Sequence, residues 1–229
     1  MKRFWVSAVL VVLAASGPAT AAYYVAGDFN GWNAAGDLMT ETSPGVYQVA
    51  LAGLNLGRHE FKVTVGDWSQ NWPGSGNAWL YTDGAGNIVI TYDSRTHADG
   101  WSCDGLRLGL SMDPGAWTAA GDWQGWSNAN PATAMVALGG GLYRYQQTLA
   151  PGSYQYMAVV TGSWDAIGAD ARSVNANSIG FQVTPANTTA VFYVDALRGT
   201  AKVDVVPEPA ALSLLVLGGL VLRARRRPR

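Results

Sequence analysis

The tryptophans are the residues of this sequence with the most specific chemistry. Nine of the ten lie between residues 22 and 205, and Trp68 and Trp72 share one Gly/Asn/Pro-rich segment, GDWSQNWPGSGNAW. A flat indole covers the apolar face of a sugar ring at little cost in side-chain entropy. Nearby carboxamides, here those of Asn71 and Asn77, orient the hydroxyl groups of such a ligand. An indole serves equally well in the core of a β-sandwich, so the sequence leaves both roles open.

A repeated hexapeptide indicates which elements position these residues. GDFNGW at 27–32 returns as GDWQGW at 121–126, and further matches follow in the same order with an offset that grows only from 94 to 102. Trp68 answers to Trp164, Asn77 to Asn177, and VITYD at 89–93 to VFYVD at 191–195. Ordered self-similarity is the signature of a repeated structural unit. We therefore predict two copies of one domain, at 22–100 and 110–205, joined by a linker at 101–109.

Each copy has the pattern of an all-β domain. Short runs rich in β-branched and aromatic residues alternate with Gly, Asn, Asp and Pro, which favours a β-sandwich over a helical fold. The segment LRLGL near the linker is a further strand candidate that fits the sheet of either copy. The expected strands cover residues 23–27, 46–51, 59–65, 77–82 and 87–93 in the first copy, and 117–121, 142–149, 154–160, 179–183 and 190–195 in the second.

The first 21 residues have the pattern of a secretory signal peptide. Lys2 and Arg3 precede an apolar run from about Phe4 to Ala15, and Ala19-Thr20-Ala21 is a small-residue cleavage site. The run is too short for a comfortable membrane span. We expect this segment to be a helix that is removed on export, so that the mature chain begins at Ala22.

The segment from 206 to 229 has the pattern of a membrane anchor. The sequence Val206-Pro207-Glu208-Pro209 precedes a short apolar stretch, expected to be a transmembrane helix, and five arginines stand in the last seven residues. Arginines after an apolar stretch stay on the cytoplasmic side of a membrane. This tail resembles the PEP-CTERM sorting signal of Gram-negative bacteria, in which Pro-Glu-Pro precedes a short span and an arginine cluster, here Arg223, Arg225, Arg226 and Arg227. The resemblance implies recognition by an exosortase, transient attachment to the membrane, and delivery to the cell envelope, surface or extracellular matrix. An ordinary C-terminal anchor is the alternative.

The two copies resemble a family of immunoglobulin-like early-set β-sandwiches. The ordered landmarks VAGDFNGW, GVYQVAL, GRHEFKVTVGDW and GNIVITYD are similar to those of pullulanase-associated X25 modules and family 48 carbohydrate-binding modules. In that family two tryptophans and a lysine form a shallow face for an α-glucan. The resemblance places this face at Trp32, Lys62 and Trp68 in the first copy, and at Trp126 and Trp164 in the second. Met157 stands where the second lysine would be, which removes a donor to sugar hydroxyls.

Composition and spacing argue against several other functions. Without the two terminal segments the chain has eight basic and fifteen acidic residues, a net charge of about −7, whereas nucleic-acid binding requires a basic surface. His59 and His97 lack the spacing of a zinc site, and Asp67 and Asp165 belong to different copies, which argues against a glycosidase pair. The lone Cys103 has no partner for an intrachain disulfide. We therefore expect a non-catalytic protein without metal or cofactor that binds a polysaccharide, or alternatively a structural spacer.

Overall fold

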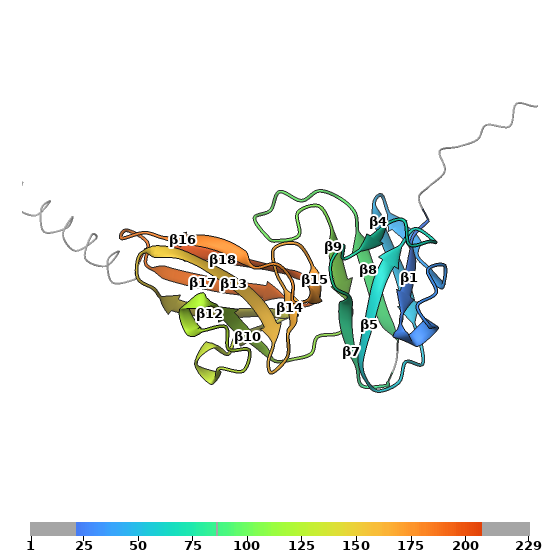
Figure 1. The fold of residues 1–229 in the computed structure, drawn as a ribbon, viewed down its shortest axis with the longest axis horizontal. Helices are drawn as coiled ribbons and strands as arrows, with labels where there is room; N and C mark the ends of the chain where they lie inside the picture. The colour runs from blue at the N-terminus through green and yellow to red at the C-terminus, as the bar shows by residue number, and fades with distance from the viewer. Residues whose placement is uncertain (1–21, 86, 208–229) are drawn as a thin grey trace, which may run out of the picture.

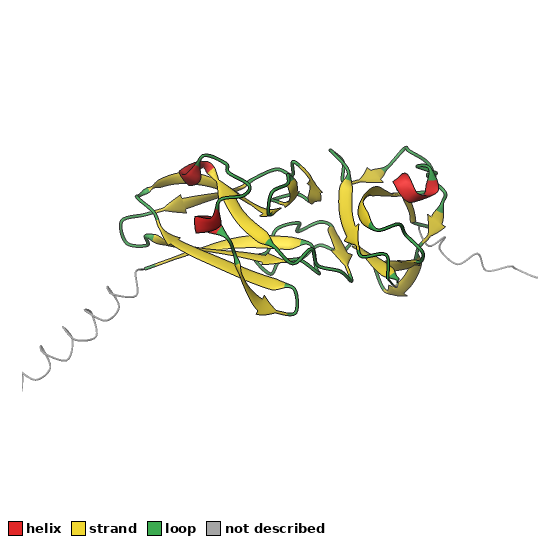
Figure 2. Ribbon diagram, turned by 90° about the horizontal axis from the view of Figure 1, so that it is seen from below, coloured by secondary structure: helices red, strands yellow, loops and turns green. Residues whose placement is uncertain are grey.

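The computed structural model describes residues 22–85 and 87–207, and within them the fold is all-β (Figure 1). The helices in this part of the chain are three-residue 3₁₀ turns, drawn in red in Figure 2. Among the described residues no helix has the length and apolar character needed to span a bilayer. The predicted signal helix at 1–21, and the predicted transmembrane helix and arginine cluster, lie outside the described residues.

The strands form four antiparallel sheets, two in each half of the chain. The N-terminal half contains strands β1 to β9 and the C-terminal half contains β10 to β18. In the first half the sheets have the orders β2-β1-β5-β6, with β7 also on β5, and β3-β4-β8-β9. In the second half they have the orders β10-β13-β14-β15, with β16 also on β13, and β11-β12-β17-β18. The second sheet has the same order in both halves, whereas in the first sheet β2 and β15 have no counterparts. The N-terminal strands are β1 Tyr24–Gly27, β2 Asp37–Leu38, β3 Thr40–Ser43, β4 Val46–Leu51, β5 Gly57–Thr64, β6 Asn71–Trp72, β7 Ala78–Thr82, β8 Ile88–Asp93 and β9 Arg107–Leu110. The C-terminal strands are β10 Trp117–Gly121, β11 Val136–Gly139, β12 Leu142–Thr148, β13 Gly152–Val160, β14 Asp165–Ile167, β15 Arg172–Val174, β16 Ile179–Val183, β17 Thr189–Asp195 and β18 Thr200–Val206.

All ten strands predicted from the sequence are present, with boundaries that differ by a few residues. Most of the strands without a prediction are short, exposed or covered on both faces, so they lack a clear alternation of apolar and polar residues. The exception is β18, whose sequence TAKVDVV does alternate and was missed. Strands β3 and β11 are fully exposed edges, whereas β14 is buried throughout. The LRLGL candidate forms β9, which pairs with β8 and so joins a sheet of the N-terminal half.

Each half buries its own hydrophobic cluster between its two sheets. Phe61, Leu80 and Ile90 from facing sheets meet in the first cluster, and Tyr156 and Phe192 meet in the second. Burial of such apolar surface contributes about 25 cal/mol per Å² and is the main favourable term in folding. Since Cys103 is the only cysteine, no disulfide within the chain supplements this burial.

The halves contact one another through β7 and β9 on one side and through β14, β15 and the β17–β18 turn on the other (Figure 1). Trp79 of β7 is fully buried and belongs to the hydrophobic cluster of the C-terminal half. Its indole Nε1 donates to the Ala166 carbonyl at 3.3 Å. The guanidinium of Arg172, also fully buried, stacks over the Trp79 ring with its carbon 4.5 Å from the ring centroid. The junction is therefore a packed interface with its own buried groups.

A carboxylate from β14 adds an ion pair to this junction. Arg58 of β5 donates from two nitrogens to the oxygens of Asp165, at 2.7 and 2.6 Å, and the Tyr81 hydroxyl donates to the same carboxylate at 2.6 Å. Asp165 is buried, so water cannot readily replace Arg58 and Tyr81 as hydrogen-bond donors to its carboxylate. Bidentate Arg–carboxylate pairs fix orientation as well as adding energy. The two halves thus have a defined relative orientation.

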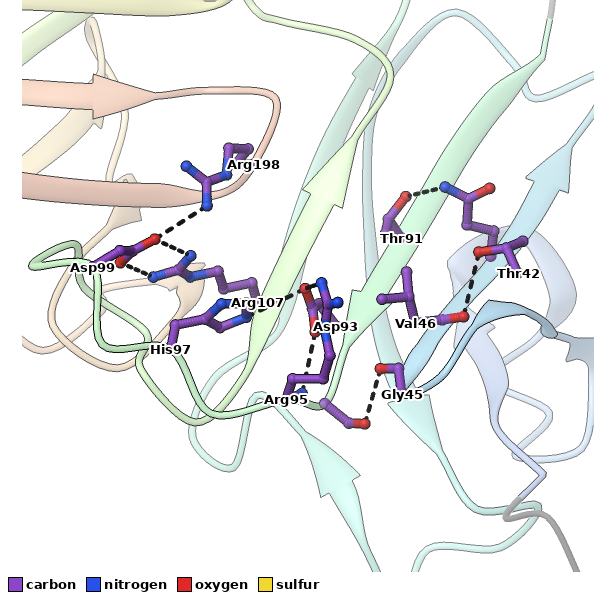
Figure 3. A network of polar contacts seen from close by, with 12 residues as sticks. Thr42, Gly45, Val46, Thr91, Asp93, Arg95, His97, Asp99, Arg107 and Arg198 are labelled. Carbon is purple, nitrogen blue, oxygen red and sulfur yellow. Dashed lines mark hydrogen bonds and ion pairs between the residues drawn. The ribbon is translucent and has the colours of Figure 1, made fainter.

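The segment expected as a linker, 101–109, is held to both halves and ends within β9. Arg107 of β9 donates to both oxygens of Asp99 at 2.7 and 2.8 Å, and Arg198 of the β17–β18 turn approaches Asp99 at 3.2 Å (Figure 3). Cys103 is buried against the Gly168 and Gly199 carbonyls, and burial raises the pKa of its thiol to about 11. Pairing of this thiol with another chain would require that local structure to open.

Candidate functional site

The repeated hexapeptide forms the same turn in both halves. In each copy a 3₁₀ turn follows the first strand, and the last tryptophan donates its backbone N–H to the first glycine, Trp32 to Gly27 at 2.8 Å and Trp126 to Gly121 at 2.9 Å. Both tryptophans have left-handed backbone angles, with φ of 58° and 57°. Left-handed geometry is uncommon for a bulky residue. The turn therefore holds each tryptophan in an unusual, defined position.

The other residues of the hexapeptide explain how the turn is held. The ring of Phe29 or Trp123 crosses the first glycine so closely that a Cβ there would lie 2.5 Å or less from ring carbons. The aspartate side chain accepts a backbone N–H of the neighbouring strand, Glu60 to Asp28 and Gln155 to Asp122, both at 3.1 Å. The aspartates thus have the structural role that short polar side chains commonly take in turns.

The four residues predicted as the site of the first copy surround one shallow hollow of about 330 Å³. Trp32, Lys62, Trp68 and Asn77 line it, and they come from the turn, β5, the β5–β6 loop and the start of β7. Trp68 is 46% exposed, and Trp32 is partly exposed. We call this the first hollow. Two indoles on either side of polar side chains give an arrangement that covers apolar ring faces and hydrogen-bonds hydroxyl groups.

The ammonium of Lys62 is oriented by two neighbours. Its Nζ donates to Asn71 Oδ1 at 2.9 Å and to the Pro73 carbonyl at 2.5 Å. Since an ammonium has three donors, one remains for a ligand. Lys62 is partly buried, and this burial lowers the pKa of its ammonium group. A partly desolvated, oriented donor gains more from a hydroxyl than one in bulk water.

Asn77 faces Lys62 across the two paired strands and is also fixed. The pairing of Phe61 with Ala78 places Lys62 opposite Asn77, on the sheet face away from the hydrophobic cluster. The amide nitrogen of Asn77 donates to Glu60 Oε2 at 2.7 Å, so its orientation is set from within the protein.

The predicted residues of the second copy surround a matching second hollow, of about 340 Å³. Trp126, Trp164 and Met157 line it together with Asn175, Ala176, Asn177 and Ser178. Met157 pairs with Ala120 as Lys62 pairs with Ala26, so the register confirms that methionine replaces lysine at this position. Trp164 is 39% exposed. The floor of this hollow is apolar, with Met157, Val159 and Ala176 in one buried cluster against Trp126.

The structure corrects one match of the sequence comparison and adds residues that it missed. Tyr156 pairs with Ile179, which places Ser178, and not Asn177, at the position of Asn77. Asn177 instead bonds the Asp170 carboxylate at 2.7 Å. Asn175 and Ala176 also enter the hollow from the segment between β15 and β16. The sequence comparison marked this segment only through Asn177 and named neither of these two residues.

Several other candidates have structural partners. Trp79 and Trp117 lie in the hydrophobic cluster of the C-terminal half, and Trp72 contacts the ring of Tyr92. Asp67 accepts from Ser69, and Asp165 lies in the junction between the halves. Among residues 22–85 and 87–207, no group of three or more His, Cys, Asp or Glu side chains is arranged to hold a metal ion.

Comparison with known proteins finds a similarity within the C-terminal half. Residues 115–200 match the family model of the pullulanase X25 domain, and this match covers less than half of the chain. The matched region contains the second hexapeptide and the whole of the second hollow.

No curated protein matches the chain. Two solved structures match over most of its length, with low TM-scores. One is SusF from Bacteroides thetaiotaomicron, with 16% identity over 86% of this chain and 50% of that one, and a TM-score of 0.34. The other is pullulanase from Bacillus acidopullulyticus, with 12% identity over 81% of this chain and 28% of that one, and a TM-score of 0.30. The chain thus spans half of SusF and about a quarter of pullulanase.

Proposed function

We propose that this protein is an exported, non-catalytic glycan-binding protein whose ligand is an α-glucan-like polysaccharide. The first hollow carries the proposal, because it combines an exposed Trp68, a partly exposed Trp32 and an oriented Lys62 in one shallow surface. A shallow open surface accepts part of a long chain, whereas a small ligand favours an enclosed pocket. The similarity of residues 115–200 to a pullulanase domain supports the choice of an α-glucan.

We further propose that the two halves are tandem copies of one immunoglobulin-like module, at the predicted 22–100 and 110–205, with β9 from the predicted linker added to the first copy. The shared order of one sheet, β3-β4-β8-β9 and β11-β12-β17-β18, and the repeated turn support this proposal. The second hollow, with Met157 in place of lysine, is then the weaker or the more apolar of two related sites.

The proposed location is the cell envelope, surface or extracellular matrix. The signal peptide at 1–21 would direct export, and the Pro207-Glu208-Pro209 tail with its arginine cluster would be recognised by an exosortase. Strand β18 ends at Val206, directly before this tail. Replacing Pro207 and Pro209 by alanine in the native host, followed by fractionation, tests the sorting step: retention in the membrane is the expected result, and unchanged release contradicts it.

Affinity electrophoresis tests the binding function. The chain from Ala22 to Pro207, which holds all the described strands and both hydrophobic clusters, is run in native gels cast with glycogen, amylopectin, pullulan or no polysaccharide. We expect retardation by at least one glucan and its loss in Trp32→Ala/Trp68→Ala. Val136→Ala/Leu138→Ala, which removes exposed apolar residues of β11, is the matched control and keeps the retardation. Equal mobility in every gel would leave a structural spacer as the better explanation.

A further inference from the structure

We infer that the two hollows are adjoining parts of one binding surface, on which a single glucan chain lies across the junction between the halves. This inference rests on the proposed function and extends it from two separate sites to one. Its basis is a backbone contact that connects the wall of one hollow to the wall of the other.

The contact lies between Asn77 and the end of β15. Val174 donates its backbone N–H to the Asn77 carbonyl at 3.0 Å, and the next residue, Asn175, lines the second hollow. Asn77 itself lines the first hollow. Residues bonded across strands have Cα atoms about 5 Å apart and neighbours in the chain 3.8 Å apart. The Cα atoms of Asn77 and Asn175 therefore lie within roughly 10 Å of each other.

Neighbouring contacts hold this connection close. At Gly76 an added Cβ would lie 2.9 Å from the Val174 carbonyl oxygen, so the loop before β7 lies directly against β15. On the other side, Asn175 donates its N–H to the Trp164 carbonyl at 3.0 Å. A short series of backbone bonds thus runs from the polar wall of the first hollow to an exposed tryptophan of the second.

The relative position of the hollows is fixed by the buried junction beneath them. Asp165 directly follows Trp164 and accepts from Arg58 and Tyr81 of the other half. Trp79 and Arg172 fill the interior of the same junction. Two sites in fixed register bind one long ligand with a gain that two sites on a flexible linker cannot match.

The chemistry of the two hollows is complementary along such a chain. The first hollow offers a charged donor and carboxamides, and the second offers an apolar floor between Trp126 and Trp164. Sugar units of a glucan present both hydroxyl edges and apolar faces. Lys62 would orient the chain by its hydroxyls, while the second pair of indoles would add stacking without a requirement for a further charge.

Isothermal titration calorimetry with linear α-glucan oligosaccharides of increasing length tests the inference. The chain from Ala22 to Pro207 is compared with Trp32→Ala/Trp68→Ala and Trp126→Ala/Trp164→Ala. We expect short oligosaccharides to bind weakly and longer ones to bind about a hundredfold more tightly, with one long chain per protein molecule. Each double variant should lose this gain with length.

The other outcomes separate the two proposals. Two oligosaccharides per protein at every length, with no gain in affinity, would overturn the single surface and keep the binding function. No heat of binding at any length, together with unretarded migration in glucan gels, would reject the binding function itself. As a folding control, the thermal unfolding of each variant is measured. An unfolding temperature equal to that of the wild type shows that the loss of binding comes from the altered hollow and not from unfolding.

Discussion

The two hollows share a scaffold and differ most in the side chain at the centre of the floor, besides Ser178 at the position of Asn77 and the added loop residues of the second hollow. Each is bounded by a left-handed tryptophan at the end of a 3₁₀ turn and by an exposed tryptophan in the loop after the long central strand. Lys62 stands on that strand in the first hollow, and Met157 stands there in the second. The backbone and the pair of tryptophans are thus repeated in both hollows. The residue that would hydrogen-bond the hydroxyl groups of a sugar ligand is present only in the first. The scaffold sets where a ligand lies, and the floor residue sets which polar contacts it makes.

The largest expected effect concerns the interface that makes the two halves one body. Trp79→Ala would remove a fully buried indole that belongs to the C-terminal cluster although it comes from the N-terminal half. We expect a loss of about 3–5 kcal/mol in the free energy of unfolding. Urea denaturation followed by circular dichroism measures it, with Trp68→Ala as the control, since an exposed site changes stability by about 0.5 kcal/mol or less. A small effect of Trp79→Ala would mean that the halves are stable without their interface.

The ion pair across the junction gives the next largest effect. Arg58→Gln leaves the buried Asp165 with Tyr81 as its remaining side-chain donor from the other half. Breaking a buried pair costs about 3–5 kcal/mol, but Arg58 is 34% exposed, so we expect about 1–3 kcal/mol. Arg144→Gln, on the surface of the C-terminal half, is the matched control. Equal stability of both variants in urea denaturation would contradict a structural role for the pair.

Replacing the lysine tests directly what distinguishes the hollows. Lys62→Met gives the first hollow the floor residue of the second, and we expect glucan binding to weaken about tenfold, or 1.4 kcal/mol. The reason is the loss of the one ammonium donor that is not used by Asn71 or Pro73. Calorimetry with a short oligosaccharide measures the change, and Lys202→Met, outside both hollows, is the control. An unchanged affinity would show that the indoles alone account for binding.

The smallest expected effects concern the two aspartates of the repeated turn. Asp28→Ala and Asp122→Ala each remove an acceptor for a backbone N–H, at a cost of about 1 kcal/mol. Asp28 also contacts His59 Nδ1 at 2.8 Å. Within residues 22–85 and 87–207, no histidine contacts the Asp122 carboxylate, which accepts the Gln155 N–H. Asp28→Ala should therefore be the more destabilising of the two in urea denaturation, and the reverse order would contradict this difference.

The same histidine makes the difference depend on pH. Burial lowers the pKa of His59, but hydrogen bonds to the Asn55 carbonyl and to Asp28 outweigh it, and the net shift is upward from 6.5. A raised folded-state pKa stabilises the fold below the unfolded value and loses that contribution as the pH rises through the folded value. We therefore expect Asp28→Ala to destabilise more at about pH 6 than at about pH 8.5. The Asp122→Ala variant should show no such dependence.

Much of the fold could be predicted because its signals are local. Alternating apolar and polar residues indicated ten strands. The ordered repeats placed Met157 at the position in the second copy that Lys62 has in the first. The four residues predicted for the first hollow do lie together. The approach of Asn175 and Ser178 to the second hollow could not be predicted, since it depends on the path of a loop in which the repeat pointed to Asn177 alone. The burial of Arg172 could not be predicted either, because a charged residue in a short polar segment is expected to be exposed to solvent.

The sequence by itself determined the strands and the duplicated turn, because strand period and turn chemistry depend on neighbours along the chain. Only the tertiary structure decided which tryptophans are accessible. Trp79 pairs with Glu60 and lies on the same sheet face as Lys62 and Asn77. The two-residue alternation of side chains along a strand therefore predicts that Trp79 is as accessible as Lys62 and Asn77. It is buried because the C-terminal half covers that end of the face, while the end with Trp32 and Trp68 stays open. The alternation of side chains along a strand specifies which residues share a sheet face. Only the packing of the two halves specifies which part of that face is covered.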